Sequence, residues 1–299
     1  MARSGIGSGH RSALARTLAL TVALGLALAL ALAPQPGAAQ EEVPFITTPD
    51  HVTLAMLQLA RVAPRDFVLD LGSGDGRIVI TAAKAFGARG LGVEIVPELV
   101  ERSRDLARRA GVADRTEFRV QDLFATDLST ASVITMYLLP EVNMQLRPAL
   151  LKLRPGTRIV SHDWDLGDWR PDHTLVVEVP DKVVGREKLS RLHLWTVPAR
   201  LQGLWCARAP SGRSASLHVQ QVHQQARARL RHPGGEVELS GAIQGERMQL
   251  AIDSRRMTSI WRLEQTPAAQ RLVAHVLQGD LRPWRGIAFV RSNQPDCGG

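Results

Sequence analysis

The sequence predicts an α/β fold, a parallel sheet with helices on both faces, followed by a smaller mainly-β C-terminal domain. Two observations carry this prediction. Between residues 67 and 162, short apolar runs typical of strands alternate with segments of helical spacing, and this alternation favours a parallel sheet. From residue 201 onward, apolar and polar residues alternate between Gly, Asp and Pro turns. This alternation predicts a small antiparallel β-domain or open barrel over residues 201–294.

The segment before these elements has the pattern of a secretory signal. Three arginines precede an uncharged stretch over residues 17–33 that is rich in Leu and Ala, and small residues follow up to Ala39. This order predicts a signal peptide over residues 1–39 that is cleaved after Ala39. The apolar stretch is marginally short for a membrane span, so an uncleaved anchor in the inner membrane is the alternative. Both versions place the following domain outside the cytoplasm, periplasmic or secreted, because the positive residues stay inside.

The elements of the α/β domain, residues 41–200, are expected in the following order. Strands are expected at the β-branched and apolar runs, at 67–71, 90–95, 116–121, 132–138 and 158–162. Helices are expected after Thr48, which we interpret as an N-cap with Pro49 at the first position, and at 77–86, 97–110 and 141–153. Pro148 should kink or divide the last of these helices. Two later runs, 173–179 and 191–197, predict an antiparallel hairpin at the edge of the sheet.

Three features of the C-terminal third leave alternatives open. Residues 201–299 hold 13 arginines against 7 acids, which biases this domain toward weak contact with anionic surfaces, although a solvated arginine-rich face is the preferred explanation. The basic residues are scattered, so we find no specific nucleic-acid signal. Residues 211–231 are also compatible with a partly helical segment. Cys206 and Cys297 can pair in an oxidising compartment or stay free, and no spacing of metal ligands predicts a metal site.

The stretch VLDLGSGDGR, residues 68–77, holds the first candidate functional residues. Asp70, Gly72, Gly74 and Gly76 follow the pattern D-x-G-x-G-x-G at the end of the first expected strand. Glycines at this place can simply form a tight turn, but the carboxyl end of such a strand is also where these sheets bind ligands. The dinucleotide fingerprint would need glycine where this chain has Arg77, which disfavours a nicotinamide-dependent oxidoreductase.

Acids follow the next two expected strands as well. Glu94 ends the second strand, where a carboxylate can accept from both hydroxyls of a ribose. Asp122 follows the third, where it can accept from an adenine amino group with Leu123 beside the ring. With the glycine loop, these residues resemble those of class I S-adenosylmethionine-dependent methyltransferases, over residues 43–198. The resemblance implies a Rossmann-like seven-stranded sheet and S-adenosyl-L-methionine as cofactor, its methionine part against the loop.

Three further stretches narrow the resemblance. VPFITTPD (43–50), YLLP (137–140) and SHDWDLGDW (161–169) are similar to the mitochondrial lysine methyltransferases of the ATP synthase c-subunit. The resemblance implies a protein-lysine N-methyltransferase whose partner is a protein substrate. The methyl group is already activated on a sulfonium, so this chemistry needs no metal.

The same stretches supply the remaining candidate residues. Tyr137, with Leu138 and Pro140, is expected to line an acceptor channel, and His162 and Asp163 to orient the acceptor or take its proton. Thr48 is placed with the cofactor-binding residues. The alternative for His162 is a core histidine whose hydrogen bonds are satisfied.

The predicted export from the cytoplasm favours a second kind of function, one without catalysis. S-adenosylmethionine is charged and does not cross a bilayer freely, which conflicts with an exported enzyme. The alternative function is therefore a non-catalytic envelope binding protein built on a methyltransferase fold.

Overall fold

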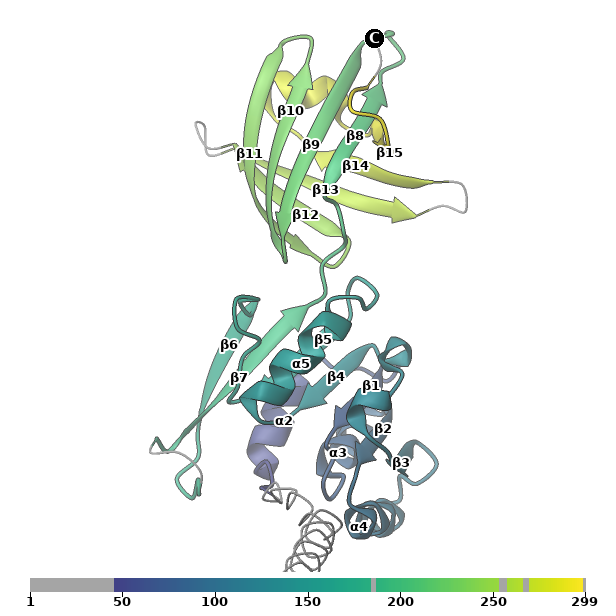
Figure 1. The fold of residues 1–299 in the computed structure, drawn as a ribbon, viewed down its shortest axis with the longest axis vertical. Helices are drawn as coiled ribbons and strands as arrows, with labels where there is room; N and C mark the ends of the chain where they lie inside the picture. The colour runs from purple at the N-terminus through teal and green to yellow at the C-terminus, as the bar shows by residue number, and fades with distance from the viewer. Residues whose placement is uncertain (1–45, 184–186, 253–256, 266–268, 298–299) are drawn as a thin grey trace, which may run out of the picture. The chain divides into compact units, whose positions relative to one another are not determined.

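The computed structural model describes residues 46–183, 187–252, 257–265 and 269–297 (Figure 1). It separates residues up to Ile46 from a second unit that contains both domains predicted from the sequence. The predicted signal peptide lies outside the described residues. Within the described part of the chain, no helix is long and apolar enough to cross a membrane.

A seven-stranded sheet forms the first domain and has the order β3-β2-β1-β4-β5-β7-β6. Its strands are β1 (Phe67–Leu71), β2 (Arg89–Glu94), β3 (Thr116–Val120), β4 (Val133–Met136), β5 (Arg158–His162), β6 (His173–Glu178) and β7 (Leu189–Thr196). Strands β1 to β5 are parallel, whereas β7 is antiparallel to both β5 and β6. The seven-stranded sheet and its hairpin edge are therefore confirmed. The carboxyl ends of β1 to β5 meet at one edge, and the β6–β7 connection returns to that edge because His162 pairs with Leu192.

Helices cover both faces of this sheet because successive residues of a strand point to opposite faces. The helices are α2 (Asp50–Leu59), α3 (Arg77–Phe86), α4 (Pro97–Arg109) and α5 (Pro140–Leu150). Val68 of β1 belongs to a buried cluster with α2 and α3. Its neighbours Leu69 and Leu71 belong to a second cluster that includes residues of α5. One strand thus joins two apolar layers.

The expected cap at Thr48 is wrong, and so is the expected division of a helix at Pro148. Helix α2 begins at Asp50 with Pro49 as its N-cap and no side-chain cap, because the Thr48 hydroxyl is hydrogen-bonded to His162 instead. Helix α5 runs undivided through Pro148. This proline lies in the last turn, so the hydrogen bond that its missing N–H removes does not interrupt the preceding turns.

The second domain is an eight-stranded antiparallel barrel that is closed rather than open. Its strands are β8 (Gly203–Arg208), β9 (Ser214–Val222), β10 (Gln225–His232), β11 (Gly235–Gln244), β12 (Arg247–Ile252), β13 (Met257–Gln265), β14 (Gln270–Val276) and β15 (Ala288–Ser292). The helical alternative for residues 211–231 is wrong, because every second side chain is buried over 215–219 in β9 and over 226–230 in β10, the period of a strand. Closure gives each of these strands a partner on both sides.

Apolar side chains fill the interior of the barrel, and a disulfide links the C-terminal segment to strand β8. Trp205, Trp261 and Phe289 are fully buried in one apolar cluster. Cys206 in β8 and Cys297 after β15 form a disulfide, which resolves the alternatives that the sequence left open for these cysteines.

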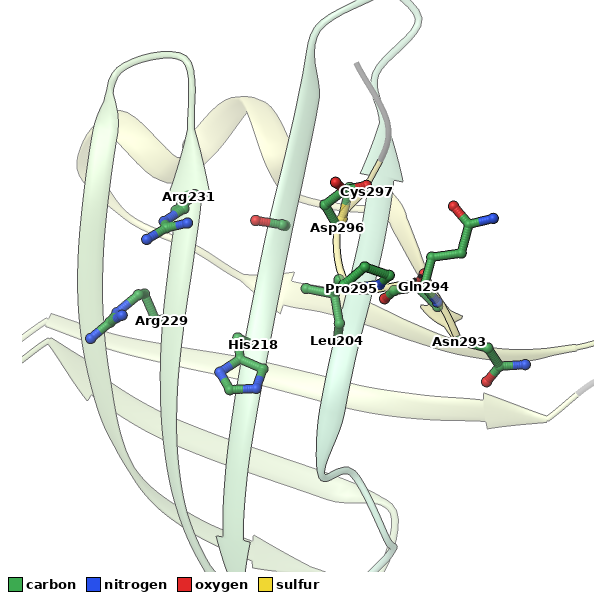
Figure 2. A pocket seen from close by; sticks show the side chains of 11 residues that line it. Leu204, His218, Arg229, Arg231, Asn293, Gln294, Pro295, Asp296 and Cys297 are labelled. Carbon is green, nitrogen blue, oxygen red and sulfur yellow. Dashed lines mark hydrogen bonds between the residues drawn. The ribbon is translucent and has the colours of Figure 1, made fainter.

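A hollow of about 470 Å³ lies between the C-terminal tail and the outer face of β9 and β10 (Figure 2). Arg229 and Arg231 line it, but Arg231 forms an ion pair with Glu236, and Arg229 forms ion pairs with Glu236 and Glu238. The hollow therefore carries little uncompensated charge.

Candidate functional site

The glycine loop between β1 and α3 has the backbone that only glycine adopts easily. Gly72, Gly74 and Gly76 have φ of 70, 54 and 76°, in the left-handed region. A Cβ at Gly72 would lie 2.8 Å from Leu138 Cδ2, and one at Gly76 would lie 2.6 Å from Phe118 Cε1. The loop is therefore packed against β3 and against the segment after β4, next to Tyr137.

Glu94 holds this loop to the end of β2. Its Oε2 accepts a hydrogen bond from the Gly74 N–H at 3.0 Å, and its Oε1 accepts from the N–H groups of Ile95 and Val96 at 2.8 and 3.1 Å. The carboxylate is only partly buried, so its remaining lone pairs are open to a ligand. The sequence predicted a ribose acceptor here, and the structure adds that the same side chain positions the loop.

Asp70 lies beneath the loop and is fully buried. Its Oδ1 accepts a hydrogen bond from Thr135 Oγ1 at 2.7 Å. Burial raises the pKa of Asp70 to about 7, and the nearby charges of Glu94 and Asp75 add to the rise, while the bond from Thr135 opposes it. The pKa of Asp70 therefore depends on the charges of the acidic residues around the loop.

Asp122 and Leu123 lie at the end of β3, as predicted. Asp122 is exposed, and its Oδ1 accepts from the Phe124 N–H at 2.8 Å, which caps a short 3₁₀ turn. Two large apolar side chains beside these acids are unusually exposed, Ile95 at 64% and Phe124 at 51%. This edge thus combines accessible carboxylates, which accept from hydroxyl and amino groups, with apolar surface for a purine. The residues present fit S-adenosylmethionine.

Sequence reasoning missed several groups that support the loop. A Cβ at Gly92 of β2 would lie 2.6 Å from Ser73 Oγ and 2.7 Å from Phe118 Cδ1. Ser103 Oγ donates to the Gly74 carbonyl at 3.0 Å. Gly92 carried a readable signal, because glycine inside a strand often marks close approach of another segment.

Arg77, noted in the sequence only for breaking the dinucleotide fingerprint, also anchors the loop. Its guanidinium contacts the buried Asp75 at 2.7 Å and donates to the Thr48 carbonyl at 2.9 Å. Burial opposes ionisation of Asp75, but Arg77 outweighs it and holds the pKa of that carboxyl below its usual value.

The three predicted catalytic residues lie together at the ends of β4 and β5. The rings of Tyr137 and His162 are stacked with centroids 3.9 Å apart. Tyr137 Oη lies 3.5 Å from Asp163 Oδ2. Burial raises the pKa of Tyr137 to about 12, and the Asp163 charge contributes. The phenol therefore stays protonated at neutral pH.

His162 has the environment of a positioning residue. It is 1% exposed, with Nδ1 3.1 Å from Thr48 Oγ1 and Nε2 2.8 Å from Ser190 Oγ. Burial lowers its pKa to about 4, so the imidazole is neutral at pH 7. These contacts fit the interpretation of His162 as a histidine with satisfied hydrogen bonds, and they place the Thr48 side chain on the acceptor side of the site.

Asp163 has an unusual backbone conformation, and its carboxylate lies beside Tyr137 and His162. Its φ is 64°, and the Trp164 N–H donates to the His162 carbonyl at 2.8 Å across it, the hydrogen bond of a γ-turn. Asp163 Oδ1 accepts from the Arg191 N–H at 3.0 Å, and Oδ2 lies 2.7 Å from Lys182 Nζ. Lys182 was not predicted, because nothing in the β6–β7 connection distinguishes it in sequence.

Comparison with known proteins identifies the family. The model of the ANTKMT methyltransferase domain matches residues 70–173. A protein-lysine N-methyltransferase of Saccharolobus islandicus is 44% identical over 138 residues, which are 46% of this chain and 86% of that protein. The chain belongs to the class I S-adenosylmethionine-dependent methyltransferases. This membership favours the enzyme over the non-catalytic envelope protein.

Other relatives share a smaller part of their length. The lysine N-methyltransferase of the ATP synthase c-subunit from Mus musculus is 40% identical over 108 residues, 36% of this methyltransferase and 43% of that protein. This chain thus spans less than half the length of that relative. An RNA methyltransferase from Salinibacter ruber, solved with S-adenosyl-L-homocysteine, is 50% identical and covers 52% of this chain and 96% of its own, with a TM-score of 0.47.

Proposed function

We propose that this methyltransferase transfers methyl groups to lysine side chains of a protein. The observation that carries the proposal is the Asp163 carboxylate, which is buried beside Tyr137 and already binds a lysine ammonium at 2.7 Å. The site is contiguous with the glycine loop, because Leu138, next to Tyr137, is the side chain that approaches Gly72. The names of the archaeal and mitochondrial relatives support lysine as the acceptor.

The cofactor, when bound, supplies a methyl group already activated on a sulfonium. The residues of the chain then have to orient an amine and let it lose its proton. The partly buried surroundings of Tyr137 disfavour an ammonium, whereas the Asp163 carboxylate favours it, so the amine has to give up its proton as it leaves that carboxylate for the methyl group. Tyr137 remains a hydrogen-bond donor, His162 keeps its neighbours in place, and Asp163 is the carboxylate that receives the amine and its proton.

Labelled cofactor tests this function directly. The protein is incubated with methyl-labelled S-adenosylmethionine and a cell-envelope extract, and with the same extract after its lysines have been acetylated. We expect label in protein, recovered as methylated lysine, and none after acetylation. Label that resists protease but is removed by ribonuclease, or label that survives acetylation, would contradict lysine as the acceptor.

We further propose that the protein acts outside the cytoplasm. The basic start, apolar middle and small-residue end of residues 1–39 support export. The Cys206–Cys297 disulfide supports an oxidising compartment. Mass spectrometry of the periplasmic fraction should find a chain that begins at Gln40. An intact N-terminus in the cytoplasm would contradict export and would remove the conflict over how the cofactor reaches the enzyme.

The arginine-rich barrel is proposed to make only weak contact with anionic surfaces. Co-sedimentation with anionic vesicles should fall steeply as salt rises. Binding that persists at high salt would indicate a specific site instead.

A further inference from the structure

Lys182 sits where the proposed function needs an acceptor lysine. Its Nζ lies 2.7 Å from Asp163 Oδ2 and donates to the Leu189 carbonyl at 2.6 Å. The side chains of Lys182 and Asp163 are each 13% exposed. Tyr137 lies on the same carboxylate oxygen at 3.5 Å. An ammonium thus has two oxygen acceptors, and the Tyr137 hydroxyl lies beside the same carboxylate, a set of polar groups that can recognise an ammonium ion.

The pocket around the Asp163 carboxylate has one negative charge to pair with a cation. Asp163 Oδ1 is taken by a backbone N–H, and Oδ2 faces Lys182. His162, 3.6 Å from Oδ2, adds no charge at neutral pH because burial lowers its pKa to about 4. A second ammonium entering beside Lys182 would have no carboxylate to pair with. An incoming lysine therefore has to replace Lys182 rather than join it.

Replacement is physically reasonable, because it preserves the buried ion pair. Breaking a buried pair leaves one charge uncompensated and is costly, but an exchange of one ammonium for another keeps Asp163 paired. Lys182 lies in the connection between β6 and β7, outside the hydrogen-bonded strand pairs. Its side chain can therefore leave the pocket without breaking the sheet, and its ammonium is well hydrated once outside.

We propose that the Asp163 carboxylate is the subsite for the ammonium of an incoming lysine, and that Lys182 occupies it as an internal stand-in until substrate displaces it. The strained turn at Asp163 fits such a role, because a non-glycine residue at φ 64° is retained mainly where the surroundings fix it for function. The inference rests on the proposed function, and it names the group that recognises the acceptor.

Binding of n-butylammonium to the cofactor-free protein tests the subsite. Lys182→Met removes the internal ammonium and keeps most of the apolar stem, so we expect it to bind this probe at least about tenfold more tightly than wild type in calorimetry, a gain of about 1.4 kcal/mol. Lys188→Met is the matched control, because it removes a charge from the same connection whose Nζ donates to the Lys182 carbonyl rather than to Asp163, and it should bind like wild type. Asp163→Asn combined with Lys182→Met should lose the gain. Equal affinity in Lys182→Met and wild type would overturn the proposal.

A second measurement needs no variant. In wild type, Lys182 should be protected from an amine-acylating reagent, and added Nα-acetyl-lysine methylamide should make it reactive in proportion to the occupied fraction. Lys188 should be labelled equally throughout. Labelling of Lys182 that stays constant up to saturating probe would also overturn the proposal. Neither measurement contains cofactor, so failure here would leave the methyl-transfer experiment unaffected, and failure of that experiment would leave these results standing.

Discussion

Replacing Glu94 by Gln should uncouple the glycine loop from β2, although the two side chains have nearly the same shape. The carboxylate accepts from three backbone N–H groups, one at Oε2 from Gly74 and two at Oε1 from Ile95 and Val96. A glutamine has only one acceptor oxygen. With that oxygen toward Ile95 and Val96, its NH₂ faces the Gly74 N–H, and two donors then oppose each other.

The expected cost follows from which bonds are sheltered. The N–H groups of Ile95 and Val96 are exposed, so water replaces what they lose. The Gly74 bond is partly buried and charge-assisted, and bonds of that kind contribute about 1.5–3 kcal/mol. Glu94→Gln should therefore lower the free energy of unfolding by roughly 1–2 kcal/mol, allowing for partial exposure, and Glu94→Ala should cost a similar amount. Both should also weaken cofactor binding, because the ribose would lose an acceptor.

Urea unfolding at pH 7 and calorimetric titration with S-adenosylmethionine measure the two effects separately. Glu98→Gln is the matched control, since it removes a charge from the first turn of α4 nearby. A Glu94→Gln protein that unfolds like wild type would refute the role in holding the loop. Wild-type affinity for the cofactor would remove Glu94 from the binding site.

Three further predictions concern stability. The pKa of Asp70 is raised from its usual value to about 7, so its contribution to stability is fully present below about pH 4 and is lost as pH rises toward 7. Asp70→Asn should flatten this decline of the free energy of unfolding with pH, measured by urea unfolding. An unchanged pH profile in the variant would contradict the shift. Gly92→Ala should destabilise by about 1–3 kcal/mol through overpacking against Ser73, and a neutral result would mean that the loop relaxes freely. Cys206→Ser removes a crosslink between residues 91 apart and should cost about 2–5 kcal/mol, seen as a lower thermal midpoint that reducing agent also produces in wild type but not in the variant.

The order of elements could be predicted because each depends on local pattern. Strand β1 has an apolar run that ends at a glycine-rich loop, and most of β9 and β10 alternates between buried and more exposed residues. The acids at the ends of β2 and β3 could be placed at one edge, because parallel strands share their carboxyl ends there. The residues predicted from these rules are Asp70, Glu94 and Asp122, and the structure brings them to that edge.

What sequence reasoning missed depends on contacts between distant segments. Thr48 was interpreted as a cap because the residues next to it allow one, yet its hydroxyl meets His162, 114 positions away. Lys182 reaches Asp163 only because β7 returns antiparallel beside β5. Closure of the barrel likewise depends on β15 pairing with β8 across the domain, and local alternation cannot distinguish a closed barrel from an open one.

The pKa values around the acceptor subsite constrain where the pH dependence of methyl transfer can originate. Tyr137 loses its proton only near pH 12, and His162 gains one only near pH 4, in both cases because burial disfavours the charged form. Neither group changes charge between about pH 6 and 9. We therefore expect a rise in rate over that range to report the acceptor lysine losing its proton rather than a change in the charge of Tyr137 or His162. His162→Asn should accordingly change the rate without moving the midpoint of this profile. A midpoint that shifts with that substitution would contradict the assignment of the profile to the acceptor lysine alone.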